Sequence, residues 1–322
     1  MSQVVSIELG RSIIKVCQGS YSNKKLFISK YSEHNLEDPI FIDDIRVDKK
    51  LLIDVMEKFY FSNNFNRRGI NIIISGLPNM LIRELVIPDL PKEKTHSLIQ
   101  FESRQYFPVN MDNYLIDYKQ ITKFIDNKQK KQKILLVAVP KSIIEGIIEA
   151  FSDLNLKINK IDIEANSLTK LVYHEREIRK EEKNSLYLIV NLMRYFITTV
   201  IAEDQNIIIA KTFPNYDLER MFKEGNDYGL SIENMFMYVI NEIVENIVKF
   251  YEFYKSREQN PKDISKIYLT GEVCQHFDIS SMLNSKINTQ IELLTDIQLI
   301  ENRVILNKSD LFSYSICFSG IL

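Results

Sequence analysis

Short apolar runs, separated by turn residues, dominate the first part of the chain. The pattern predicts a meander of three strands over residues 4–9, 12–17 and 25–31. An amphipathic helix over 48–61 follows, and after it an apolar strand over 71–75 that ends at a glycine. The predicted order is therefore three strands, one helix and one buried strand.

The second part of the chain repeats this order. Its predicted elements are strands over 186–191, 195–201 and 207–213, a long amphipathic helix over 231–257 and a buried strand over 264–270. Asn191 and Arg194 interrupt the apolar stretch of the first two strands, which we interpret as two buried strands rather than a membrane span. A duplicated β-β-β-α-β unit is the plan of actin and of ribonuclease-H-like ATPase domains, whose two lobes enclose a cleft.

A small module interrupts the first unit. Proline breaks and apolar spacing predict a strand over 84–87, a helix from Lys92 to Pro108, and two strands over 114–121 and 133–139. After the module, the first unit resumes with a helix over 143–154. A module of this size cannot bury a core alone, so we expect it to pack on the rest of the chain.

Three segments of this region carry a family resemblance. They are LVIPDLPK from Leu85 to Lys92, ESRQYFP from Glu102 to Pro108, and LLVAVPK from Leu135 to Lys141. In this order and spacing they resemble the type IV pilus assembly protein PilM family, actin-like proteins related to FtsA. The resemblance covers essentially the whole chain and implies an α/β, actin-like (ribonuclease-H-like) two-lobed ATPase fold with an inserted small α/β subdomain called 1C.

The resemblance also divides the chain. It implies a first lobe (1A) over 1–83 and 134–178, subdomain 1C over 84–133, a second lobe (2A and 2B) over 179–304, and a C-terminal helix over 305–322 that returns to the first lobe. The charged run over 175–183 lies at the junction of the lobes. We interpret this run as a solvated helix end, because mixed charges usually face water.

Composition narrows the function classes. A net charge of -2 over 322 residues gives no electrostatic basis for binding nucleic acid. Three cysteines and four histidines are scattered without the spacing of metal ligands, which fits a reducing cytoplasm and predicts no metal site. The N-terminal segment lacks the basic start and apolar core of a signal peptide.

The resemblance implies a nucleotide cleft, but its loops depart from the family pattern. The residues that would hold ATP and Mg²⁺ are Glu8, Gly10, Ser12 and Lys15 in the first loop, Asn191 and Arg194 in the second, and Gly271 in the third. Met193 adds bulk where a backbone amide should face a phosphate, and Glu272 adds negative charge next to Gly271. We interpret the cleft as degenerate, expect no catalytic residue, and leave open whether ATP binds.

The resemblance further implies a channel between the inserted subdomain and the first lobe, which holds the short N-terminal cytoplasmic tail of the membrane protein PilN. An extended tail needs an apolar floor and backbone partners at a strand edge. The candidate groove residues on the predicted helix are Leu98, Ile99, Glu102, Tyr106 and Phe107. The alternative is that these side chains form the core of the subdomain.

Five lysines, at positions 123, 128, 130, 131 and 133, surround the turn of the predicted hairpin. A solvated turn is the plain interpretation, and contact with lipid headgroups or with an acidic partner is the alternative. The sequence leaves both open.

The resulting prediction is a cytoplasmic scaffold at the cytoplasmic face of the inner membrane, held there through its partner. It would bind a PilN-like tail and connect the platform proteins to the pilus assembly ATPase, and homodimerisation stays open. The alternative is an active actin-like ATPase, either a cycling PilM or an FtsA-like cytoskeletal protein. An FtsA-like protein is expected to carry a C-terminal amphipathic membrane helix, whereas this sequence ends directly after its predicted closing helix.

Overall fold

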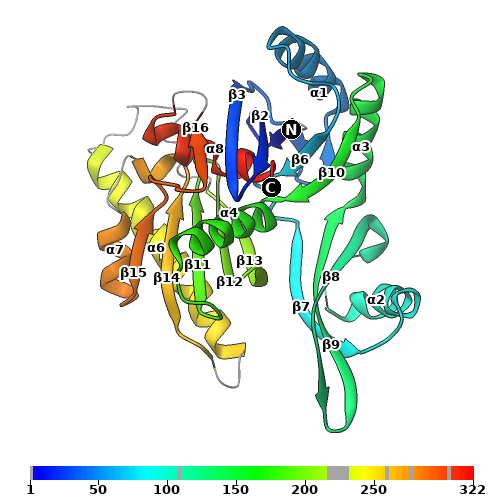
Figure 1. Cartoon of the computed structure of the whole chain (residues 1–322), viewed down its shortest axis with the longest axis vertical. Helices are drawn as coiled ribbons and strands as arrows, with labels where there is room; N and C mark the ends of the chain where they lie inside the picture. The colour runs from blue at the N-terminus through cyan, green and yellow to red at the C-terminus, as the bar shows by residue number, and fades with distance from the viewer. Residues whose placement is uncertain (1–2, 107–109, 216–231, 258–260, 276–278, 303–305) are drawn as a thin grey trace.

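A six-stranded sheet forms the centre of the first lobe (Figure 1). The computed structural model describes all residues except 1–2, 107–109, 216–231, 258–260, 276–278 and 303–305. The strands are β1 (Val4–Leu9), β2 (Ile13–Ser22), β3 (Lys25–Asn35), β6 (Ile70–Ile74), β10 (Ile158–Ile163) and β16 (Ile300–Asn302). They lie in the order β10-β6-β1-β2-β3-β16, with β1 to β3 antiparallel and β6 and β10 parallel to β1.

A five-stranded sheet of the same plan forms the second lobe. Its strands are β11 (Leu186–Leu192), β12 (Phe196–Glu203), β13 (Asn206–Pro214), β14 (Ile264–Thr270) and β15 (Gln290–Leu293), in the order β13-β12-β11-β14-β15. The duplicated unit is therefore confirmed.

Strands β11 and β12 are almost entirely buried in this sheet, which confirms the interpretation of residues 186–202 as two core strands. Within the described residues, no helix has both the length and the apolar character needed to cross a membrane.

Helices cover the sheets and connect them. They are α1 (Lys49–Val55), continued by a π-helical turn (Met56–Tyr60), then α3 (Lys141–Asp153), α4 (Glu164–Arg179), α6 (Ile232–Arg257), α7 (Ile279–Lys286) and α8 (Lys308–Ser319). Short elements complete the chain: β4 (Phe41–Ile42), β5 (Arg46–Val47), and the 3-10 turns Met111–Asn113 and Glu272–Gln275. Helix α8 returns to the first sheet, where the Asn71 side-chain amide donates to the Gly320 carbonyl at 2.7 Å.

The inserted subdomain is a three-stranded sheet with one helix. Its elements are β7 (Leu81–Pro88), α2 (Lys92–Tyr106), β8 (Tyr114–Asp126) and β9 (Gln129–Pro140), and its strand order is β7-β9-β8. Successive side chains of a strand point to opposite faces. Ile134 and Leu136 accordingly pack with Ile99 of α2, whereas Leu135 and Val139 join the core of the first lobe.

The charged run over 175–183 differs from its prediction. Glu175 is buried, and its carboxylate accepts hydrogen bonds from the backbone amides of Gln298 at 2.9 Å and Leu299 at 2.7 Å. Arg176 is buried as well and forms an ion pair with Glu181 at 3.2 Å. The interpretation as a solvated helix end is wrong for these two residues. Hydrogen bonds and ion pairs from other parts of the chain stabilise both buried side chains.

The strand that follows this contact also changes sheets. Residues Ile300–Asn302 fall within the range expected for the second lobe, yet they pair with β3 at the edge of the first sheet. The Glu175 carboxylate therefore holds the backbone directly before the strand that joins the two lobes.

Replacing Glu175 with glutamine should lower the free energy of unfolding by about 2 kcal/mol, because charge-assisted hydrogen bonds to buried amides weaken. Glu177→Gln on the same helix is the matched control, because its side chain is partly exposed, and it should change stability by less than about 0.5 kcal/mol. Urea unfolding followed by circular dichroism measures both. Equal effects of the two variants would contradict a structural role for the Glu175 contact.

Candidate functional site

The three predicted nucleotide loops meet where the two sheets face each other. Gly271, at the end of β14, lies so close to β11 that a Cβ atom there would be 2.3 Å from the Leu192 carbonyl oxygen. Its φ of +98° also excludes most side chains. The Glu272 carboxylate accepts from the Arg194 amide at 3.1 Å and lies 3.3 Å from the Arg194 guanidinium. The second and third loops are therefore joined by protein contacts.

Glu164, the first residue of α4, connects the lobes across the cleft. One carboxylate oxygen accepts from the Asn191 side-chain amide at 2.8 Å, and the other accepts from the Gly76 backbone amide at 3.1 Å. Burial raises the pKa of Glu164 to about 7, although these hydrogen bonds favour the ionised form. Glu164 is not among the site residues predicted from the sequence. The available signal was an acidic side chain directly after strand β10, at the start of a helix.

Glu8 is the second buried carboxyl group of the cleft. It lies opposite Lys15 in the β1–β2 ladder and accepts a hydrogen bond from the Ser75 hydroxyl at 3.1 Å. Burial raises the pKa of Glu8, which nearby Lys15 partly offsets. The Lys15 ammonium is directed to α8, where it donates to the Ser313 carbonyl at 2.6 Å. Lys15 thus stabilises the return of α8.

Local hydrogen bonds and one aromatic ring occupy part of the cleft. The Met193 amide donates to the Phe196 carbonyl at 3.0 Å, and the Gly10 amide donates to the Ile13 carbonyl at 3.0 Å, so both amides are used within their own turns. The Phe196 ring lies against Gly76, where a Cβ atom would be 2.4 Å from a ring carbon. The backbone amides of Gly10 and Met193 are therefore not free to bind a phosphate.

The remaining residues of the first turn also have protein partners. The Ser12 carbonyl accepts from the Leu36 amide at 2.9 Å, and the Arg11 guanidinium forms a 2.7 Å ion pair with Asp44. Two buried oxygens of the cleft, Glu8 Oε2 and Asn191 Oδ1, have no hydrogen-bond partner among the described residues. The described residues contain no group of three histidine, cysteine, aspartate or glutamate side chains that could hold a metal ion.

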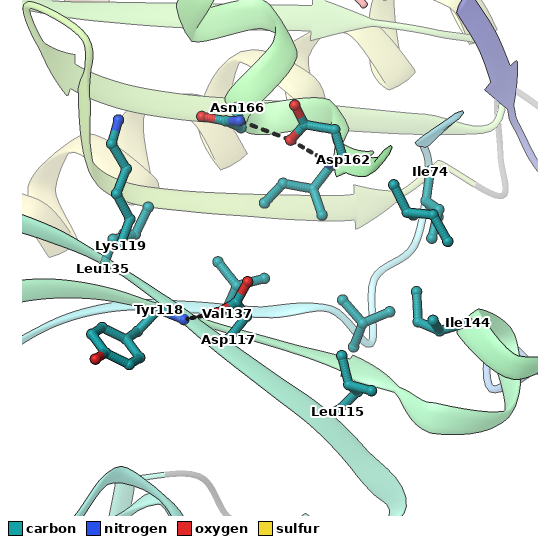
Figure 2. A pocket seen from close by; sticks show the side chains of 13 residues that line it. Ile74, Leu115, Asp117, Tyr118, Lys119, Leu135, Val137, Ile144, Asp162 and Asn166 are labelled. Carbon is teal, nitrogen blue, oxygen red and sulfur yellow. Dashed lines mark hydrogen bonds between the residues drawn. The ribbon is translucent and has the colours of Figure 1, made fainter. Parts of the chain in front are cut away.

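A second site lies between the inserted subdomain and the first lobe. It is a cavity of about 260 Å³ (Figure 2). Its apolar lining comes from both sides: Ile74, Leu115, Leu135, Val137, Val139, Ile144, Ile161 and Ile163. The position is the one that the family resemblance implies for a channel, but the subdomain contributes β8 and β9 to it rather than α2.

One end of this cavity is polar. Asp162 accepts from the Lys170 ammonium at 2.6 Å and from the Asn166 side-chain amide at 2.8 Å. Burial opposes ionisation of Asp162, but Lys170 and the hydrogen bonds outweigh it and lower the Asp162 pKa. The Lys119 side chain extends from β8 toward this group (Figure 2), and burial, together with Lys170, lowers the Lys119 pKa.

The cavity also lies between two sheet edges. Strand β8 is the outer strand of the subdomain sheet, and β10 is the outer strand of the first-lobe sheet. Residues of both strands line the cavity. An outer strand presents backbone amides and carbonyls along its unpaired side, and an extended peptide can pair with them. The site thus combines an apolar floor with backbone hydrogen-bonding groups.

The predicted groove residues on α2 lie elsewhere. Helix α2 packs on the face of the subdomain sheet opposite the cavity, with Ile99 buried in the subdomain core and Leu98 packed against it. Glu102 is half-buried on the same helix. The Tyr106 side chain and Phe107 lie outside the described residues. A binding role for this face of α2 stays a prediction.

Comparisons with known proteins agree with this architecture. The family model of the type IV pilus assembly protein PilM matches residues 6–233. A structure of the PilM-PilN type IV pilus biogenesis complex is similar over 99% of this chain and 98% of the other, with a TM-score of 0.80 and 14% sequence identity. No curated protein matches the sequence.

Two further structures are similar over most of the chain. The ethanolamine utilization protein EutJ from Carboxydothermus hydrogenoformans has a TM-score of 0.51 at 9% identity and covers 99% of this chain and 90% of its own. A Bacteroides thetaiotaomicron protein described as having an actin-like ATPase fold has a TM-score of 0.49 at 14% identity, with 90% of each chain covered. The predicted actin-like, two-lobed fold class is confirmed.

Replacing Glu164 with glutamine should change how stability depends on pH. The folded protein retains the Glu164 proton up to about pH 7, whereas the unfolded chain releases it near the ordinary pKa of 4.5. Wild-type stability should therefore fall relative to Glu164→Gln by roughly 3 kcal/mol as pH rises through this interval.

Unfolding free energies of both proteins between pH 4.5 and pH 8 measure this difference, with the exposed Glu145→Gln variant as the control for a loss of one charge. A difference that stays constant over the interval would show that Glu164 is not a buried, proton-retaining group.

Proposed function

The chain belongs to the PilM family of type IV pilus assembly proteins, and from this membership we propose that it is a scaffold of the inner-membrane assembly platform. Its work is to hold the N-terminal cytoplasmic tail of a PilN-like membrane protein. The cavity between the subdomain and the first lobe is the observation that carries this proposal. A solved relative is described as a PilM-PilN complex, which supports the choice of partner.

An extended tail fits the chemistry of this cavity. The apolar side chains from β8, β9 and the first lobe accept alternate side chains of a strand, and the edges of β8 and β10 supply backbone partners. A cavity of about 260 Å³ has room for a few side chains rather than for a folded element. Lys119 and Asp162 at its polar end would set the position of the tail through polar contacts.

The tail would place the protein at the cytoplasmic face of the inner membrane. There it would connect platform proteins to the pilus assembly ATPase, and a homodimer is compatible with this role. Binding through a short tail leaves the second lobe accessible to such partners.

In this proposal the cleft is structural and works without a nucleotide. Glu164 and Asn191 hold the lobes together, Phe196 fills the space beside Gly76, and the Met193 amide is already bonded. A triphosphate would have to displace these contacts. These contacts support the interpretation of the nucleotide loops as degenerate.

The second candidate function is an active actin-like ATPase. The observation in its favour is that oxygen atoms of Glu8, Glu164 and Asn191 gather in the cleft, where two of them lack a hydrogen-bond partner among the described residues. Such oxygens suit a hydrated Mg²⁺ ion. Nucleotide binding therefore separates the two candidates.

Replacing Leu115 with glutamate should weaken tail binding at least tenfold. Leu115 lines the cavity and is 45% exposed, so the change places a charge on the floor of the groove without opening a core. Calorimetric titration with a synthetic PilN-like tail peptide measures the affinity.

Glu102→Arg is the companion variant, because Glu102 lies on α2, on the other side of the subdomain sheet. It should leave tail affinity within about twofold, since no groove contact changes. The reverse result, with loss of binding for Glu102→Arg alone, would move the tail site to α2 and restore the groove predicted from the sequence.

Titration of the wild-type protein with ATP and Mg²⁺ should show no binding up to millimolar concentration. The double variant Asn191→Asp, Met193→Gly, which restores a carboxylate and a small residue in the second loop, should bind more tightly than wild type. Clear binding of ATP by the wild-type protein would instead favour the ATPase candidate. Unchanged peptide affinity of the double variant confirms that it remains folded.

A further inference from the structure

The β8–β9 hairpin projects beyond the rest of the inserted subdomain. Strand β7 pairs with β9 only as far as Pro88, which lies opposite Lys131. The two hairpin strands continue past this point through the pairs Ile125 with Lys130 and Asp126 with Gln129. Figure 1 shows this end of the hairpin extending away from both lobes. We call residues 123–131 the hairpin apex.

The apex exposes an apolar side chain. Ile125 is 72% exposed, and among the described large apolar residues only Phe101, on α2 of the same subdomain, is more exposed, at 75%. Ile125 and Lys130 form a cross-strand pair, so their side chains share one face of the hairpin. Exposure of an isoleucine to water is unfavourable, so burying this side chain in an apolar environment would lower the free energy.

Lysines surround this isoleucine. Lys128 and Lys130 are exposed at the turn, whereas Lys123 and Lys131 form 2.7 Å ion pairs with Asp89 and Asp126. The start of α2 adds two exposed lysines, at positions 92 and 94, with the exposed Glu93 between them. It lies beside the apex, because the Asp89 amide donates to the Lys130 carbonyl at 2.9 Å. The apex is therefore basic, although the whole chain has a net charge of -2.

The turn holds these groups in a fixed geometry. Asn127 and Lys128 both have positive φ, at 47° and 64°, as in a two-residue type I′ turn. The β2–β3 hairpin has the same turn at Asn23 and Lys24, with φ of 51° and 58°. Lys24 thus occupies an equivalent backbone position on another surface, and it offers a matched control.

We propose that the hairpin apex contacts the surface of an anionic lipid bilayer. Its lysines lie among the acidic headgroups, and Ile125 enters the boundary between headgroups and acyl chains. An apolar side chain flanked by cations is the arrangement that interfacial elements use, and a projecting tip suits a deformable surface better than a preformed protein pocket.

The choice of a membrane over an acidic protein rests on the proposed function, in which a membrane-protein tail keeps the chain near the bilayer. A tethered protein needs only weak affinity for the surface, because the tether raises its effective concentration there. The exposed Lys128 and Lys130, with one isoleucine, are enough for such a second contact, since each lysine near an anionic surface multiplies partitioning about fivefold.

Sedimentation with large unilamellar vesicles tests the proposal on the full chain without any tail protein. Wild type should bind vesicles of 30% phosphatidylglycerol at low salt and should not bind pure phosphatidylcholine vesicles. Lys128→Gln with Lys130→Gln should lower partitioning about 25-fold, at about fivefold for each lysine. Ile125→Ser should weaken binding further, whereas Lys24→Gln should leave it unchanged.

Two results would overturn the proposal: no binding of wild type to the anionic vesicles, or binding that the apex variants leave unaltered. The first would point to an acidic protein as the apex partner. Leu115→Glu should retain vesicle binding, so a failure of the tail site and a failure of the apex are distinguished. Circular dichroism confirms that each variant is folded before sedimentation.

Discussion

The two faces of strand β9 determine how the inserted subdomain works. A strand directs successive side chains to opposite sides, so β9 can be covered by two different partners at once. Its even-numbered residues, such as Ile134 and Leu136, pack against α2, and its odd-numbered residues, such as Leu135 and Val139, face the first lobe. The subdomain needs both contacts, because three strands and one helix bury too little apolar surface to be stable alone. The cavity lies on the face that α2 does not cover.

The buried ionisable side chains at the two contacts between the lobes differ in how many hydrogen-bond partners they have. At the lobe junction, Glu175 and Arg176 each have several hydrogen-bond or ion-pair partners, which offset the cost of burying them. In the cleft, Glu8 and Glu164 are buried near each other with fewer donors, and burial raises the pKa of both. A carboxyl group that retains its proton near neutral pH can lie at a lobe contact at a lower electrostatic cost than an ionised one.

The Asn191 side-chain amide can hydrogen-bond to Glu164 in either protonation state of the carboxyl group. Its Oδ1 has no partner in the described structure, while its Nδ2 donates to Glu164. If the amide turned over, Oδ1 would accept a hydrogen bond from a protonated Glu164, so either protonation state of the pair can be satisfied. An aspartate at this position would add a third carboxyl group and lose that adaptability. Asparagine therefore suits a cleft held together by hydrogen bonds rather than by a bound cation.

Much of the fold could be predicted from the sequence, whereas the site could be predicted only in part. Apolar periodicity placed β11, β12 and the long helix α6 because their patterns depend on local spacing, whereas the three loops of the cleft were predicted from the family resemblance. Spacing alone does not reveal what covers an element. The apolar stripe of α2 is compatible with either a binding groove or a subdomain core. Only the structure places Ile99 of α2 in the subdomain core and Leu115 of β8 in the lining of the cavity. Polar residues buried by distant partners, Glu164 and Glu175 above all, have no periodic signal, because residues far along the chain provide the contacts that stabilise them.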